Sequence, residues 1–156
     1  MNKITLNKEQ IYEYQQNRDP YLMIDYASEV IPGVSSKGYK DLNDDEWFFK
    51  VHWPNDPNMP GMLQVESLVQ MSSLSILTLP NNKGKIMYLV SSNNIKFIKK
   101  ILPKSRFNIE TKIKSFKRGI AICEGIGLVN NEIVCKAEFN LILPEEIKKY
   151  SLEKKS

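Results

Sequence analysis

Residues 51–79 read VHWPNDPNMPGMLQVESLVQMSSLSILTL, a proline-rich loop followed by an almost wholly apolar stretch. The prolines stiffen the loop because each one fixes φ. Pro60–Gly61 stands where a helix can begin, since proline is tolerated at the first helical position. A helix that is apolar on nearly all sides has to be surrounded by the rest of the protein. We therefore predict a buried central helix over residues 62–79, around which the fold is arranged.

The same helix is long enough to be compared with a membrane span. It carries Gln64, Glu66 and Gln70 among several hydroxyl side chains, and a charge deep in a bilayer is costly. Residues 1–6 also lack the apolar stretch of a secretory signal. We expect no membrane span and a cytoplasmic location.

His52 is the only histidine of the chain, and Glu66 is the one carboxylate of the apolar stretch. An imidazole titrates near neutral pH, and burial can raise the pKa of a carboxyl toward the same range. The two residues are therefore candidates for a general acid–base pair. The structural alternative is a histidine that caps the helix and a glutamate that is favoured near a helix N-terminus.

The composition is that of an ordinary globular chain. Its 156 residues are 42% hydrophobic and 26% charged, which suits a single domain over 1–156, with a core over 9–144 and a charged tail over 145–156. Cys123 and Cys135 are isolated in apolar sequence and are expected to be buried free thiols. With one histidine and two scattered cysteines, the usual ligands of a zinc site are too few, so we expect no metal.

The strands predicted on both sides of the central helix give a fold of class α+β. A short helix is expected over residues 7–16 with Asn7 as its N-cap. Asn130–Asn131 suits a tight hairpin because asparagine tolerates positive φ. The tail from Pro144 is expected to be a frayed end or a brief helix. Strands are predicted over residues 21–31, 36–42, 86–100, 106–117, 119–129 and 132–143.

Several motifs lie at fixed distances from His52. Residues 52–54 read HWP, residues 57–61 read PNMPG, Glu66 lies fourteen positions after His52, and Gln70 lies four further on. This pattern resembles the active-site segment of the FabZ-type (3R)-hydroxyacyl-acyl-carrier-protein dehydratases, a family of the hotdog fold. Shorter likenesses to the same family occur at residues 18–25, 95–103 and 117–139.

The resemblance implies a hotdog fold, in which a curved antiparallel sheet wraps around the long central helix. It also implies removal of water from a (3R)-3-hydroxyacyl thioester to give a trans-2-enoyl thioester. His52 would take the α-proton, and Glu66 would protonate the departing hydroxyl directly or through a water. Each site would combine His52 of one protomer with Glu66 of the other, in a homodimer or a trimer of dimers. No cofactor is implied beyond the phosphopantetheine arm that carries the substrate.

Further residues have roles that follow from their position near this pair. Gly61 at the helix start can donate its N–H to the substrate carbonyl as charge develops there, or it is a plain helix-start glycine. Gln70 stands one turn beyond Glu66 and either orients its carboxyl or satisfies a polar group at an interface. Five apolar residues are candidates for an acyl tunnel, with core packing as the alternative: Met59, Met62, Leu63, Phe97 and Ile98.

Four residues depart from the pattern of the family that the chain resembles. Val51 stands where that family usually has glycine before the histidine, Asn55 replaces a glycine after the proline, and Lys104–Ser105 replaces a Gly-Asp pair. Val51 adds bulk beside the reacting centre and restricts the backbone. We therefore expect slower turnover, or a different acyl preference, than in housekeeping dehydratases.

The segment from Lys96 to Arg118 is strongly basic, with Glu110 as its only acid. Local positive charge attracts anionic partners, and acyl carrier protein, an acidic helical bundle, fits a dehydratase of the kind resembled. Nucleic acid is not expected, because no recognised motif accompanies the charge; a solvated strand face is the structural alternative. The candidate docking residues are Lys96, Lys99, Lys100, Lys104 and Arg106.

Two other functions compete with dehydration. One is a non-catalytic hotdog module that binds an acyl chain or scaffolds a complex, and the retained His52 and Glu66 argue against it. The other is thioester hydrolysis, against which the Pro-Met-Pro-Gly entry to the helix argues. Glutamate rather than aspartate at position 66 also resembles the branch of the family that dehydrates without isomerising.

Overall fold

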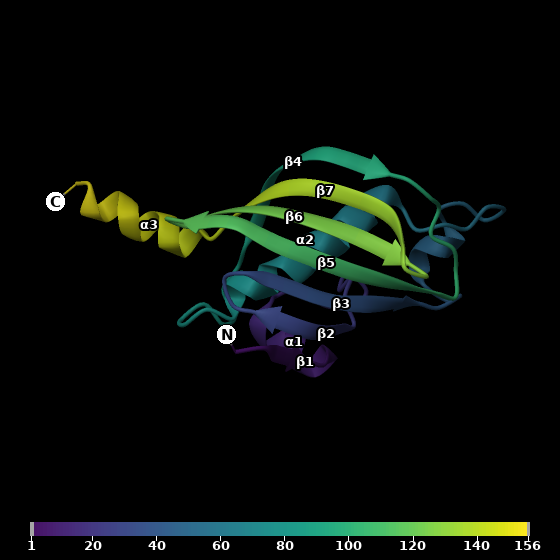
Figure 1. Cartoon of the computed structure of the whole chain (residues 1–156), viewed down its shortest axis with the longest axis horizontal. Helices are drawn as coiled ribbons and strands as arrows, with labels where there is room; N and C mark the ends of the chain where they lie inside the picture. The colour runs from purple at the N-terminus through teal and green to yellow at the C-terminus, as the bar shows by residue number, and fades with distance from the viewer. Residues whose placement is uncertain (1, 156) are drawn as a thin grey trace.

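A curved antiparallel sheet wraps around one long helix, α2 (Gly61–Leu77), in the computed structural model, which describes residues 2–155 (Figure 1). The sheet has the strand order β1-β2-β3-β5-β6-β7-β4. Its strands are β1 (Ile4–Leu6), β2 (Tyr26–Ile31), β3 (Ser35–Leu42), β4 (Tyr88–Phe97), β5 (Ser105–Lys117), β6 (Ile120–Val129) and β7 (Glu132–Ile142). Three short helices complete the described part of the chain: α1 (Lys8–Tyr14), the 3-10 helix η1 (Trp47–Lys50) and α3 (Pro144–Glu153). The predicted α+β class is confirmed.

The predicted central helix is confirmed as α2, one residue earlier at its start and two residues earlier at its end. Every residue from Leu63 to Leu77 except Glu66 is buried, as expected of a helix that is apolar on nearly all sides. The sheet approaches α2 closely at Gly38 of β3. A Cβ atom there would lie 1.9 Å from the Tyr26 carbonyl oxygen and 2.6 Å from the Met71 side chain of α2. Only glycine fits between strand and helix there.

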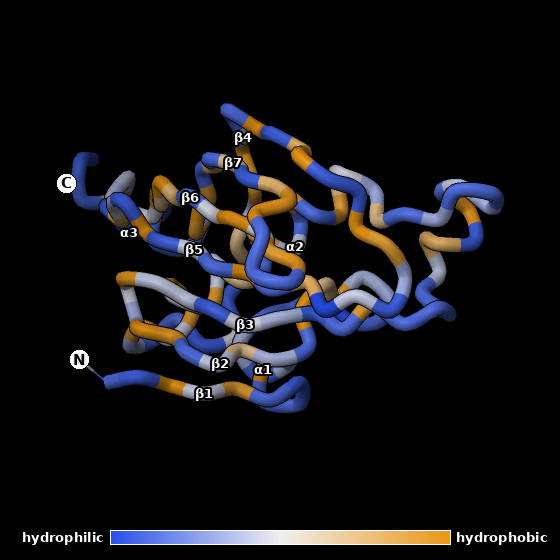
Figure 2. The backbone as a smooth tube through the Cα atoms, turned by 45° about the vertical axis from the view of Figure 1, so that its right-hand side comes forward, coloured by the Kyte–Doolittle hydropathy of each residue, from blue (hydrophilic) through white to orange (hydrophobic). Residues whose placement is uncertain are grey.

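Alternation along the strands assigns one face of the sheet to α2 and the other to solvent. On β7, for example, Lys136 is exposed between buried Cys135 and Ala137, and Figure 2 shows the matching change between hydrophilic and hydrophobic colour along the strands. The two buried thiols are thus confirmed as free cysteines on the core side. This pattern separates the helix-facing side of the sheet, where Glu66 lies, from its outer face.

Most of the predicted boundaries hold. The Asn7 side chain accepts from the Gln10 N–H at 2.9 Å and caps α1 as predicted. Asn130 and Asn131 take φ values of 50° and 63° in the β6–β7 turn, which confirms the hairpin chemistry. The tail forms α3, the brief helix of the two alternatives, and it extends away from the sheet (Figure 1).

One predicted strand begins later than expected. The prediction of a strand from residue 21 is wrong for its first five residues, because β2 starts at Tyr26. The Met23 N–H instead donates to the Gln70 side chain of α2 at 2.7 Å. A buried side chain therefore replaces a neighbouring strand as the hydrogen-bond partner of this segment.

Candidate active site

The His52 loop is closed by its own backbone. The His52 N–H donates to the Phe48 carbonyl at 2.8 Å, and the Asn58 N–H donates to the His52 carbonyl at 3.2 Å. The half-buried imidazole lies against the Trp53 ring, with the ring centroids 4.5 Å apart. The Met59 N–H donates to the Ile101 carbonyl at 2.9 Å, which fixes the end of the loop to the segment after β4.

A single hydrogen bond defines the tautomer of His52. Its Nδ1 lies 3.1 Å from the Asn58 carbonyl oxygen, and a carbonyl oxygen can only accept. Nδ1 therefore carries the proton in the neutral ring, and Nε2 keeps its lone pair. This arrangement suits a general base that acts through Nε2.

Glu66 is the one residue of the buried part of α2 that reaches partial exposure. Burial raises the pKa of its carboxyl, and a hydrogen bond from Gln70 partly opposes this shift. The Gln70 Nε2 donates to Glu66 Oε1 at 2.9 Å and to the Tyr21 carbonyl at 2.9 Å, while its Oε1 accepts from the Met23 N–H at 2.7 Å. Gln70 thus holds the carboxyl of Glu66 with an amide group whose nitrogen and oxygen both have backbone partners.

Gly61 begins α2, so its N–H has no acceptor within the helix, and no side chain caps this helix. The Phe97 ring lies against it, because a Cβ atom at this position would come within 2.7 Å of Phe97 Cζ. A side chain would therefore displace the ring that borders the helix start. The free donor at the positive end of the helix dipole is available to an oxyanion.

A groove of about 310 Å³ opens beside Glu66. Along α2 it is lined by Glu66, Val69, Gln70, Ser73 and Leu77, one stripe with helical spacing. Its other lining residues come from the segment after α1, from the entry and start of β4, and from β7: Gln15, Gln16, Asn17, Lys85, Ile86, Met87, Tyr88, Leu89 and Leu141. The groove thus has a mixed apolar and polar lining, and Glu66 is its only carboxylate among the described residues.

Within a single chain His52 and Glu66 are not brought together. Among the described residues no hydrogen bond joins them, and His52 does not line the groove beside Glu66. The five tunnel candidates do not line it either. Met59 and Leu63 are buried in the core, and the other three, Met62, Phe97 and Ile98, are at least half exposed.

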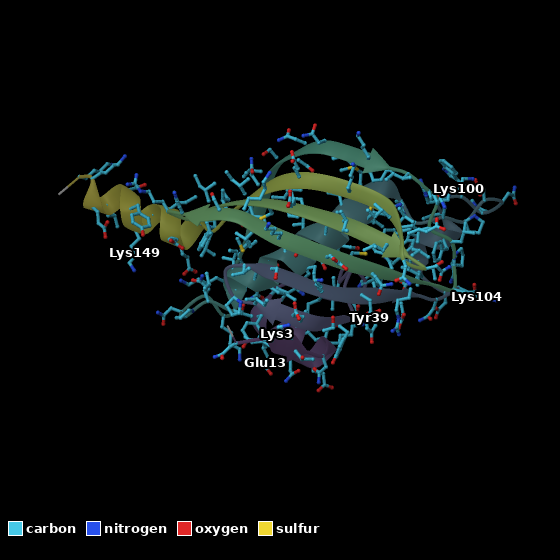
Figure 3. All side chains as sticks on the ribbon, in the orientation of Figure 1. Lys3, Glu13, Tyr39, Lys100, Lys104 and Lys149 are labelled. Atoms are coloured by element: carbon cyan, nitrogen blue, oxygen red, sulfur yellow. The ribbon has the colours of Figure 1, made fainter. Side chains whose placement is uncertain are left out.

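The candidate docking residues are mostly paired with acids from distant parts of the sequence. The pairs are Lys99–Glu132, Lys100–Asp56, Lys104–Asp44 and Arg106–Asp41. Within the described chain only Lys96 of the five has no such pair. Lys100 and Lys104 lie at the end of the molecule opposite Lys149 of α3 (Figure 3).

Sequence reasoning missed the groove wall and Tyr21. The helical stripe from Glu66 to Leu77 follows from spacing and was available in the sequence. The wall from Lys85 to Leu89 could not be predicted from the sequence, because it depends on the path of the chain after α2.

The membrane question is answered by helix length and composition: no described helix is long and apolar enough to cross a membrane.

The fold and the site define a class of protein. A family model described as a FabA-like domain matches residues 16–138. Solved structures of the same fold include the dehydratase heterocomplex ApeI:P from Xenorhabdus doucetiae, with 12% identity and a TM-score of 0.73 over 91% of this chain and 95% of that chain. At that identity the likeness shows the fold alone, and it confirms the predicted hotdog fold.

Curated relatives narrow this class. A protein of Bacillus licheniformis is 33% identical over 90% of this chain and 98% of its own length. Proteins of Bacillus subtilis (34%, over 90% and 99%) and of a Roseiflexus species (35%, over 83% and 91%) are similar. All three are named 3-hydroxyacyl-[acyl-carrier-protein] dehydratase FabZ. The chain belongs to this FabZ-type family of dehydratases, as the spacing of its motifs indicated.

Proposed function

We propose that this protein is a 3-hydroxyacyl-[acyl-carrier-protein] dehydratase that removes water from (3R)-3-hydroxyacyl thioesters during acyl-chain biosynthesis. The observation that carries the proposal is the half-buried Glu66, whose pKa is raised by burial and whose carboxyl is held by Gln70 beside a groove. Family membership supports the same reaction.

The chemistry divides between two side chains and one backbone donor. His52 Nε2 takes the α-proton of the thioester, which the adjacent carbonyl acidifies. Glu66, whose pKa is raised by burial, gives a proton to the leaving β-hydroxyl, so that water departs and the trans-2 double bond forms. The Gly61 N–H donates to the carbonyl oxygen while it carries enolate charge. These groups supply every proton transfer, so no cofactor is needed.

A second copy of the chain completes the site in this proposal. β4 ends the strand order, and no described strand pairs with its outer edge. Its first residues, Tyr88, Leu89 and Val90, are exposed, and an exposed apolar edge of this length favours pairing with another strand. Two β4 strands in antiparallel contact would give a homodimer with one continuous sheet.

Antiparallel pairing also accounts for the separation of His52 from Glu66. β4 begins at Tyr88, beside the groove of Glu66, and ends at Phe97, which lies against Gly61 at the end of the His52 loop. The partner's strand runs the opposite way, so His52 of the partner subunit is carried toward this groove. The strand order therefore supports the proposal of a shared site, and a trimer of such dimers is a further prediction.

The carrier is proposed to be acyl carrier protein, as in the names of the relatives. Docking at Lys99, Lys100, Lys104 and Arg106 would require these side chains to exchange their present acidic partners for those of the carrier. Exposed pairs are weak, at about 0–1 kcal/mol each, so this exchange is feasible. We also propose a cytoplasmic location, which cell fractionation would check.

The direct test is an assay of enoyl absorbance on a ladder of 3-hydroxyacyl thioesters carried by acyl carrier protein or by coenzyme A. Dehydration should appear as enoyl product with the carrier bond intact. Free thiol without enoyl product would identify a thioesterase instead. Acyl binding without turnover on any member of the ladder would identify a non-catalytic module.

A further inference from the structure

A concavity of about 600 Å³ lies on the outer face of the sheet, away from α2. Five strands contribute to it: β3, β4, β5, β6 and β7. Val34 and Ile126 are its partly exposed apolar members, and four lysines line it: Lys37, Lys96, Lys112 and Lys136. It shares no lining residue with the groove beside Glu66, and the mechanism above does not use it.

Two pairs of like-charged residues lie opposite each other on neighbouring strands of this face. Only one of the two pairs is compensated by an opposite charge from the described residues. Glu124 of β6 is opposite Glu138 of β7, and Lys114 lies between them, 3.8 Å from the first carboxylate and 3.7 Å from the second. Lys96 of β4 is opposite Lys136 of β7. Among the described residues neither of these two lysines has an ion pair.

The nearby acids are already engaged. Glu110 pairs with Lys37 at 3.5 Å, and Glu138 accepts a further hydrogen bond from Asn94 at 2.7 Å. Directly opposed like charges destabilise a strand pair. The acidic pair has its compensating cation within the chain, whereas the described residues provide no ion-pair partner for the basic pair. A bound anion would supply the negative charge that Lys96 and Lys136 lack.

We propose that the concavity binds a small organic anion whose phosphate or carboxylate head lies between Lys96 and Lys136. Two ammonium groups on adjacent strands can donate to different oxygens of one such head. The rest of the ligand would rest on Ile126 and Val34. The volume fits a small molecule, since pockets of this kind span roughly 300–1,000 Å³. Because the site faces away from the groove, it would act as a separate binding site.

The test is calorimetric titration of the whole protein with three probes: pyrophosphate, adenosine monophosphate and citrate. Lys136→Gln and Lys96→Gln should each weaken binding about tenfold, which corresponds to about 1.4 kcal/mol. Lys149→Gln on α3 is the matched control, because it removes the same charge far from the concavity; binding should stay within about twofold. Circular dichroism of each variant checks that it is folded.

The outcomes separate the ligand classes. Binding of pyrophosphate and adenosine monophosphate but not citrate assigns a phosphate head, and the reverse assigns a carboxylate head. Equal weakening by Lys149→Gln would mean that only net charge matters and would overturn the site. Absence of binding by all three probes would overturn it as well. Dehydratase turnover should be unchanged by the probes, so this result is independent of the proposed activity.

Discussion

His52 and Glu66 are held in place in opposite ways. The histidine lies on a loop that is closed by main-chain hydrogen bonds, and its ring Nδ1 donates to the backbone carbonyl of Asn58. The glutamate projects from a buried helix and depends on one side chain, Gln70, that reaches two other segments. A backbone-held group tolerates substitution of its neighbours, whereas a side-chain-held group does not. The two halves of the site should therefore differ in how their surroundings respond to mutation.

The largest effect is expected at the two residues themselves. His52→Ala and Glu66→Ala should each lower dehydration by about 10²–10⁴-fold, the usual contribution of acid–base catalysis. Both variants should fold, because neither side chain belongs to the buried core. Turnover on 3-hydroxyacyl thioesters is the measurement, with thermal unfolding as the control. Near wild-type turnover in either variant would exclude that residue as a proton-transfer group.

Mixing the two inactive variants tests whether the halves come from different protomers. In a heterodimer of His52→Ala with Glu66→Ala, one of the two shared sites keeps both residues, so part of the activity should return. The assay follows turnover after subunit exchange, with heterodimers verified by tagged purification. Verified heterodimers that stay inactive would place both residues of a site within one chain.

Gln70→Leu tests whether Glu66 depends on the one side chain that holds it. It leaves the buried Met23 N–H without its partner, at about 1–3 kcal/mol, and also frees the part-buried Tyr21 carbonyl. The free energy of unfolding should therefore fall by roughly 2–4 kcal/mol. Activity should fall about tenfold, and the pKa of Glu66 should rise further, because the hydrogen bond that lowers it is lost.

The matched control for Gln70→Leu is Ser73→Ala. Ser73 lines the same groove, but its hydroxyl donates only to the Gln70 carbonyl one turn back, at 2.8 Å. Its removal should cost about 1 kcal/mol or less and leave the pH profile of turnover unchanged. A loss in Ser73→Ala equal to that in Gln70→Leu would mean that general packing, not the amide, supports Glu66.

This contrast also explains what the sequence could predict. The spacing from His52 to Gln70 predicts the helix, the order of the site residues and the family, because these depend on local periodicity and motif. The hydrogen bond from the Met23 N–H to Gln70 joins residues 47 positions apart, so no local sequence pattern predicts it. The ion pairs of the basic segment leave no local signal for the same reason, since its acidic partners, among them Asp56 and Glu132, lie outside it in the sequence.

Glu66→Gln gives a smaller effect, on stability and its pH dependence. The pKa of Glu66 is raised in the folded protein, so the folded state binds more protons than the unfolded state above the ordinary pKa of 4.5. Wild-type stability should be full below that pH and decrease as pH rises through the raised pKa. The neutral amide of the variant has no such pH dependence. The stability of the variant should therefore increase relative to that of the wild type as pH rises. Chemical denaturation across pH 4–8 measures this; parallel curves would contradict the raised pKa.

The smallest expected effect is at Val51, the departure beside His52. Its side chain is 67% exposed in the single chain, and the loop that follows is fixed by backbone hydrogen bonds, so Val51→Gly should cost only about 0.5–1 kcal/mol through the entropy of the unfolded chain. If Val51 instead shapes the entry for substrate, the variant should change its preferred acyl length or gain rate on straight chains, because bulk beside the thioester is removed. The ladder of 3-hydroxyacyl thioesters distinguishes the two. An unchanged acyl profile with slightly lower stability would show that the histidine half of the site tolerates its neighbour, as expected of a backbone-held group.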